Sequence, residues 1–187
     1  MSEMKAQIPN TMTFRGSIYE IIGLSQNILF CPEDFGFRPA MIHTGCYDGF
    51  YGHYRIARKN LFLDRLTIFS EDRAYPVLNG SYPRQSREEY GCMVYDGIRL
   101  LIPFTGSVRL GRGFICRYYV RLGYQKPSGY RTVIDCSFKH GVLVHFINRS
   151  REAAAIRGKF KEEFCDQANG SVVEKIDRAF SLGMEFL

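Results

Sequence analysis

The sequence contains one long stretch in which basic and aromatic residues occur without any acidic residue. No Asp or Glu lies between Gly97 and Ile134, whereas seven Lys or Arg residues and six Phe or Tyr residues do. The whole chain has 25 basic and 19 acidic residues, so the remainder, 18 against 19, is nearly neutral. A localised positive field attracts phosphates, carboxylates or an acidic protein surface.

Within this stretch, arginines and tyrosines are spaced closely enough to form one anion-binding or partner-binding site. Guanidinium groups bind phosphates and carboxylates through paired, charge-assisted hydrogen bonds, and tyrosine rings can stack on bases. The predicted binding residues are Arg109, Arg112, Arg117, Arg121, Tyr119 and Tyr124. The alternative is that the arginines lie on separate solvated faces or pair with carboxylates elsewhere in the chain.

The segment Gly113–Gly123 fits either a helix or a strand, and periodicity alone does not decide between them. Arg117 and Arg121 are four residues apart, so in either case they are expected to share a face. The glycines of the preceding segment, 106–113, lack the Gly-Lys-Ser/Thr ending of a phosphate loop and favour a tight turn or bulge beside a strand.

Residues His43, Cys46 and Asp48 place an imidazole, a thiol and a carboxylate within six positions. This is the least implausible catalytic group, because a Cys nucleophile needs a base within hydrogen-bond reach. A loop with one half-buried His is the alternative interpretation. The four histidines and six cysteines lack metal-ligand spacing, so neither a metal site nor a cofactor is predicted, and no residue is assigned a catalytic role.

The elements that must position these residues are mainly strands. Turn dipeptides such as Asp48-Gly49, Asn79-Gly80, Asp96-Gly97 and His140-Gly141 punctuate residues 12–147. The predicted strands are Thr13–Ile22, Asn27–Phe30, Phe50–Ala57, Leu61–Phe69, Ile98–Phe104, Ser107–Leu110, Arg131–Phe138 and Val142–Ile147. The prediction is a mainly β, α+β protein built on an antiparallel β-sandwich or barrel.

Two hairpins look alike. Tyr54-Arg55-Ile56 turns through Lys59-Asn60 into Leu61-Phe62-Leu63, and Cys136-Ser137-Phe138 turns through His140-Gly141 into Val142-Leu143-Val144. Two similar halves would give this pattern, and so would two unrelated hairpins.

The C-terminal region changes to helical periodicity. A stripe of apolar residues from 150 to 167 and a capping box at Ser171 predict an αα-hairpin over 150–183. This hairpin is expected to pack on the β-core. The alternative is an arm that forms a homodimer through the C-terminal helices or docks a partner.

Length and composition fit one domain over residues 1–187, with 45% hydrophobic residues to form a core. No secretory signal and no apolar run of about 20 residues is found, so a cytoplasmic protein without membrane contact is predicted. The six cysteines lack a C-x-x-C pair and are expected to be reduced and mostly buried.

Three short segments carry a resemblance to a family. At 75–80, 101–106 and 123–127 the chain resembles a family of small uncharacterised bacterial cytosolic proteins, over about residues 40–150. The resemblance implies a bacterial or phage-borne protein and transfers no functional residue.

The predicted function is a non-catalytic binding module that engages an acidic protein or a nucleic acid through a basic-aromatic face. One alternative is an inhibitor or immunity-type protein that caps a partner enzyme. The other is a small-ligand-binding barrel or an unrecognised hydrolase that uses His43 and Cys46. Whether the chain is an enzyme is left open, with the residues favouring a negative answer.

Overall fold

A computed structural model describes residues 6–26, 28–121 and 123–163. Its strands are β1 (Thr11–Phe14), β2 (Ser17–Leu24), β3 (Phe50–Ala57), β4 (Asn60–Ile68), β5 (Arg84–Gln85), β6 (Met93–Leu101), β7 (Gly106–Phe114), β8 (Tyr130–Lys139) and β9 (Val142–Asn148). The helices are α1 (Ser150–Glu163) and the short 3-10 turns η1 (Pro32–Phe35), η2 (Cys116–Tyr118) and η3 (Pro127–Gly129).

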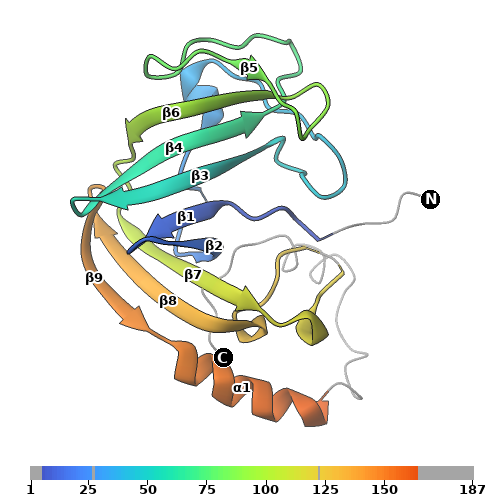
Figure 1. The fold of residues 1–187 in the computed structure, drawn as a ribbon, viewed down its shortest axis with the longest axis vertical. Coiled ribbons are helices and arrows are strands. Elements are labelled where there is room, and N and C mark those ends of the chain that lie inside the picture. The colour runs from blue at the N-terminus through green and yellow to red at the C-terminus, as the bar shows by residue number, and fades with distance from the viewer. Residues whose placement is uncertain (1–5, 27, 122, 164–187) are drawn as a thin grey trace.

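The nine strands form one sheet in the order β3-β1-β2-β7-β8-β9-β4-β6-β5. A further pairing of β3 with β4 turns the sheet into a ring, and β1 and β3 are its parallel pair (Figure 1). The ring is not a regular barrel, because β9 meets β4 at the single bridge Asn60–Val142. The prediction of a mainly β protein with a sandwich-like or barrel-like sheet and a C-terminal helix is confirmed.

The observed strands differ from the predicted ones at several places. The predicted strand Thr13–Ile22 was wrong, because Arg15 (φ 49°) and Gly16 (φ 77°) split it into β1 and β2. The dipeptide Asp96-Gly97 lies inside β6, where the pairing with β4 shifts register, so it forms an irregularity of the strand and not a turn. Residues 28–30 form no strand.

The two similar hairpins meet at one corner of the ring (Figure 1). The amide of Leu61 donates to the carbonyl of Gly141 at 2.8 Å, and the amide of Leu143 donates to the carbonyl of Lys59 at 2.7 Å. Lys59 and Gly141 occupy equivalent positions, directly before the second strand of each hairpin, and Leu61 and Leu143 are the second residues of those strands. The two bonds flank the antiparallel bridge Asn60–Val142 and join the two turns. The origin of the hairpins as two similar halves stays a prediction.

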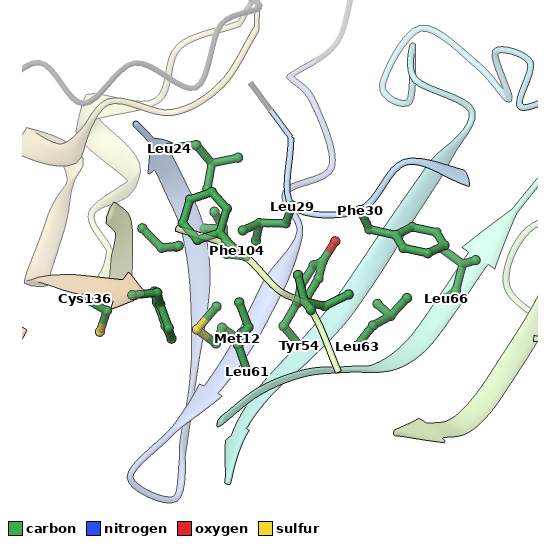
Figure 2. Close-up of a cluster of buried hydrophobic side chains, with 14 of the residues drawn as sticks. Met12, Leu24, Leu29, Phe30, Tyr54, Leu61, Leu63, Leu66, Phe104 and Cys136 are labelled. Atoms are coloured by element: carbon green, nitrogen blue, oxygen red, sulfur yellow. The ribbon is translucent and has the colours of Figure 1, made fainter. Parts of the chain in front are cut away.

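The main core fills the interior of the ring. Side chains from different strands, such as Met12, Tyr54 and Leu61, point into one cluster (Figure 2). A second, smaller cluster lies on the outer face of β8, where Ala153 of α1 packs with Tyr130 and Val133. Helix α1 therefore covers the outside of the sheet next to η3.

The first helix of the predicted C-terminal hairpin is present as α1. The side chain of Asn148 accepts a hydrogen bond from the amide of Ser150 at 2.9 Å, which satisfies one free donor at the start of the helix. The second predicted helix lies outside the described residues, and so does any pairing of two chains through it.

Candidate basic-aromatic interface

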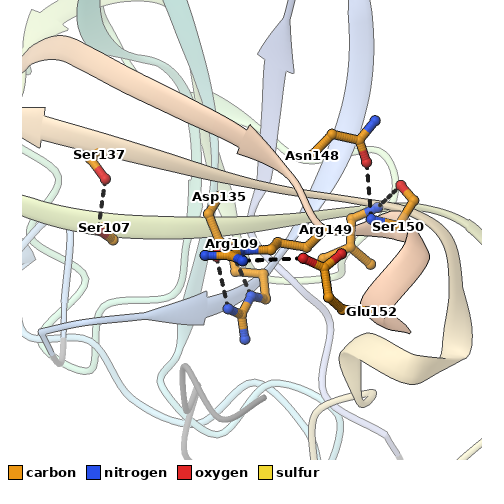
Figure 3. Close-up of polar contacts among 9 residues, drawn as sticks. Ser107, Arg109, Asp135, Ser137, Asn148, Arg149, Ser150 and Glu152 are labelled. Atoms are coloured by element: carbon orange, nitrogen blue, oxygen red, sulfur yellow. Dashed lines mark hydrogen bonds and ion pairs between the residues drawn. The ribbon is translucent and has the colours of Figure 1, made fainter. Parts of the chain in front are cut away.

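Arg109 is buried on the face of β7 that points away from the main core. It is 3% exposed and is paired in register with Asp135 on β8. Its Nε is 2.7 Å from Asp135 Oδ1, and its Nη2 is 2.9 Å from Asp135 Oδ2 (Figure 3). Arg149 approaches the same carboxylate at 3.4 Å and also contacts Glu152 at 3.1 Å. The predicted role of Arg109 in an exposed anion site is therefore corrected. The side chain is buried, and its Nε and Nη2 atoms already donate to the carboxylate of Asp135.

Arg112 lies on the opposite face of β7 from Arg109. Val108 and Leu110 point into the main core, and Arg112 continues that alternation. Its Nη1 donates to Ser17 Oγ at 2.8 Å, and its guanidinium lies 6.0 Å from the centre of the Tyr19 ring. Arg112 is exposed, so the sheet separates it from the buried pair instead of bringing the two arginines together.

The described residues of the segment Gly113–Gly123 do not form a single helix or strand. Strand β7 ends at Phe114, η2 follows, and Arg121 lies in a bend. The premise that placed Arg117 and Arg121 on one face by periodicity was therefore wrong. Both side chains are nevertheless exposed, and the guanidinium of Arg117 lies 4.9 Å from the ring of Tyr118.

The three exposed arginines of the predicted site differ from Arg109 in their partners. Among the residues that the structure describes, no ion pair joins Arg112, Arg117 or Arg121 to an Asp or Glu. Arginines that pair internally are already neutralised, as Arg109 is. The positive charge predicted from composition thus reaches solvent at the end of β7 and in the segment after it.

The two predicted tyrosines have different environments. Tyr119 is 54% exposed, and its ring lies 6.5 Å from that of Phe114 in an edge-to-face arrangement. Tyr124 is half-buried and donates to Asp48 Oδ2 at 3.4 Å. Burial, followed by the charge of Asp48, raises the pKa of Tyr124. Tyr119 is the ring available for stacking, whereas Tyr124 holds its own loop against another.

His43 and Cys46 are close in the backbone, but their side chains do not form a catalytic pair. The Nδ1 atom of His43 accepts from the Gly45 amide at 3.0 Å, and its Nε2 faces Glu89 at 3.5 Å. The Cys46 thiol is 3% exposed and donates to the Phe50 carbonyl at 3.7 Å. Burial raises the pKa of Cys46 to about 12, so the thiolate needed for nucleophilic attack is disfavoured.

Gln7 connects the loops of this region, although no pattern in the sequence singled it out. It is 6% exposed; its Nε2 donates to the Thr44 carbonyl at 2.9 Å, and its Oε1 accepts from the Tyr47 amide at 3.1 Å. Its own amide donates to the Gly123 carbonyl at 2.9 Å. A polar residue near the N-terminus gives no local signal of such a role, because its partners are about 40 and 120 residues away in the chain.

The glycines of the segment 106–113 belong to β7. A side chain at Gly111 would lie 2.8 Å from atoms of Ile22 and Tyr130, so this glycine permits close packing on the outer face.

Five cysteines are free: Cys31, Cys46, Cys92, Cys116 and Cys136. Three of these are buried, which agrees with the prediction of mostly buried thiols for the described part of the chain, whereas their reduced state stays a prediction.

Comparisons with models of known families, with curated proteins and with solved structures found no match to this chain. The resemblance to small bacterial proteins therefore stays a prediction. Among the described residues, no helix is long and apolar enough to cross a membrane, and no group of three or more His, Cys, Asp or Glu side chains is arranged to hold a metal ion.

Proposed function

We propose that the protein is a non-catalytic binding module that engages an anionic partner through the exposed end of β7 and the segment after it. The observation that carries the proposal is that Arg112, Arg117 and Arg121 are exposed without a carboxylate partner in the described residues. Tyr119, between Arg117 and Arg121 in the chain, has more than half of its side chain exposed. These four residues are called the basic-aromatic face below.

The contrast with Arg109 supports this assignment. Where this chain uses arginine for its own stability, as at Arg109 and Arg149, it supplies a carboxylate on the neighbouring strand or helix. The arginines of the basic-aromatic face receive none, so their favourable electrostatic interactions remain available to a partner.

The test is binding of labelled anionic probes as a function of salt. We would measure fluorescence anisotropy with a single-stranded oligonucleotide, a duplex and a poly-glutamate peptide. Affinity for at least one probe is expected to fall steeply with salt, and for single strands and duplexes the slope is about 0.7–0.9 per phosphate contact on a double-logarithmic plot. The variant R117E/R121E is expected to lose at least roughly tenfold in affinity, since two attractive charges become repulsive.

The matched control is R58E/R151E, which changes the net charge equally at two exposed arginines outside the basic-aromatic face. This control should retain most of the affinity. Equal loss in both double variants would mean that net charge alone drives binding. Absence of binding to every probe at low salt would contradict the proposed function.

A further inference from the structure

Three exposed tyrosines lie on loops that gather at one end of the sheet, opposite the corner where the two hairpins meet (Figure 1). Tyr47 precedes β3 and is 46% exposed, Tyr90 precedes β6 and is 98% exposed, and Tyr119 follows β7. Tyr47, Tyr90 and Tyr119, with Arg117 and Arg121, are called the tyrosine rim below.

Contacts between side chains hold the three loops together. His43, on the loop before β3, faces Glu89, on the loop before β6, at 3.5 Å. On the other side, Tyr124, on the loop after β7, donates to Asp48 at 3.4 Å. The three loops that carry the exposed tyrosines are therefore joined to one another in series.

The loops are also fixed internally. Gln7 is buried and binds the backbone on both sides of Gly45 through its side chain. Gln125 closes the loop after β7, since its Nε2 donates to the Val120 carbonyl at 2.7 Å and its Oε1 accepts from the Val120 amide at 2.8 Å. Because their backbone is held in this way, the loops of Tyr47 and Tyr119 need little further ordering on binding, which lowers the entropic cost of an interface.

Exposed carboxylates interrupt the positive charge of the tyrosine rim. Arg117 and Arg121 are exposed on the loop after β7, and Asp48, which Tyr124 of that loop contacts, is exposed as well. Glu88, on the loop before β6, is a further exposed carboxylate, and the only cation within 4.0 Å of Glu88 in the described residues is Arg65, at 4.0 Å. A nucleic acid that continued from the arginines across Tyr47 would bring its phosphates next to carboxylates, which is unfavourable. A protein surface can present an acidic patch at one end and a different charge at the other.

We infer that the tyrosine rim docks a folded protein that presents an acidic patch to Arg117 and Arg121 and an apolar, tyrosine-accepting patch to Tyr47 and Tyr90. Tyrosine and arginine are the residue types in which interface energy concentrates. The inference rests on the proposed function for the arginine end, and extends it by assigning the class of partner and the remainder of the contact surface.

The experiment places a photo-crosslinking amino acid, one position at a time, at Tyr47, Tyr90 and Tyr119 of the full chain. Ile18, which is exposed on β2 next to the turn at the opposite end, is the control position. Each variant is irradiated in an extract of the cells that produce the protein, with and without R117E/R121E, and the adducts are identified by mass spectrometry. The expected result is one protein species joined at all three tyrosine positions, absent from Ile18, and reduced at least roughly tenfold by R117E/R121E.

Other outcomes separate the inference from the proposed function. Crosslinking of a protein at Tyr119 alone, lost with R117E/R121E, would retain the proposed function and overturn the continuous tyrosine rim. Nucleic acid crosslinked at Tyr119 would retain an anionic partner and overturn a protein partner. Adducts that are insensitive to R117E/R121E, or no adduct above the Ile18 control, would overturn the inference, and the salt-dependent binding assay then decides the proposed function independently.

Discussion

Arg109 and Asp135 face each other across β7 and β8 as a buried ion pair with two hydrogen bonds, at 2.7 and 2.9 Å. Their side chains are 4% and 12% exposed, so neither charge can be solvated if the other is removed. The pair therefore contributes to stability, and it explains why one of the arginines in the acid-free stretch is not part of the binding surface.

Replacing Asp135 with Asn should lower the free energy of unfolding by about 3–5 kcal/mol, because the Arg109 charge stays buried without its carboxylate. Urea denaturation measures the change. Arg149→Ala is the control: its side chain reaches solvent, so its loss should cost much less than that of Asp135. A loss below about 1 kcal/mol for Asp135→Asn would contradict the assigned role of the pair.

The corner between the two hairpins gives a second prediction. Gly141 has φ 80°, and a side chain there would lie 2.4 Å from the carbonyl oxygen of Ile102. Gly141→Ala should therefore lower the free energy of unfolding by at least about 2 kcal/mol, since backbone strain adds to a clash with main chain. Thermal and urea unfolding would measure this loss.

Lys59, at the equivalent position of the other turn, is the matched control. It adopts φ 67° without being glycine, so Lys59→Gly should be neutral or should raise the free energy of unfolding by up to about 1 kcal/mol. Opposite signs at the two equivalent positions are the expected result. A comparable loss of unfolding free energy in both variants would show that the left-handed backbone angles do not determine the stability of these turns.

The sequence predicted those parts of the fold that are determined locally. Phe50–Ala57 was predicted with its observed bounds, because apolar residues and turn residues delimit it. The turn at Arg15 was missed because arginine gives no signal for a left-handed conformation.

Parts of the site that depend on distant contacts could not be read from the sequence. Composition showed that basic residues are concentrated between Gly97 and Ile134, but it could not reveal that Asp135 lies opposite Arg109, since that requires the register of β7 and β8. The hydrogen bonds of Gln7 to the backbone of Thr44 and Tyr47 depend in the same way on a contact between segments that are distant in sequence.

The cysteines should differ sharply in reactivity towards a thiol reagent. Cys116 is exposed, whereas burial raises the pKa of Cys46 and Cys136 to about 12 and that of Cys92 to about 11. Cys31 is partly exposed, and its hydrogen bond to Glu33 raises its pKa. In the native protein at about pH 8, Cys116 should react first and Cys31 more slowly, while the buried thiols react only after unfolding.

A C165S background removes the thiol that lies outside the described residues. In that background, a colorimetric assay of released reagent should show one fast phase, which C116S abolishes. A fast phase that persists in C116S/C165S, or a third thiol that reacts without denaturant, would contradict the assigned environments.

His53 links β3 to β1 and gives a pH-dependent prediction. Its Nδ1 is 2.8 Å from Thr11 Oγ1, and its Nε2 is 2.9 Å from Thr13 Oγ1. One ring nitrogen accepts and the other donates, which suits a neutral imidazole between two hydroxyl groups. Loss of this arrangement would weaken the parallel pairing of β1 and β3.

The environment of His53 favours its neutral form. Burial lowers its pKa, the charges of Arg55 and Arg65 act in the same direction, and Asp64 opposes them. Below pH of about 6.5, the unfolded chain therefore binds a proton more readily than the folded one. The stability contributed by neutral His53 is complete above that pH and is lost as the pH falls through the lowered folded-state pKa.

Urea denaturation at about pH 7.5 and about pH 5, with the wild type and His53→Asn, measures this contribution. Other groups titrate in both proteins, so the difference between their pH dependences isolates His53. The wild type should be the more stable protein at the higher pH, and its advantage should shrink at the lower one. An advantage that stays constant or grows on acidification would mean that the folded protein accepts the proton at His53 as readily as the unfolded chain.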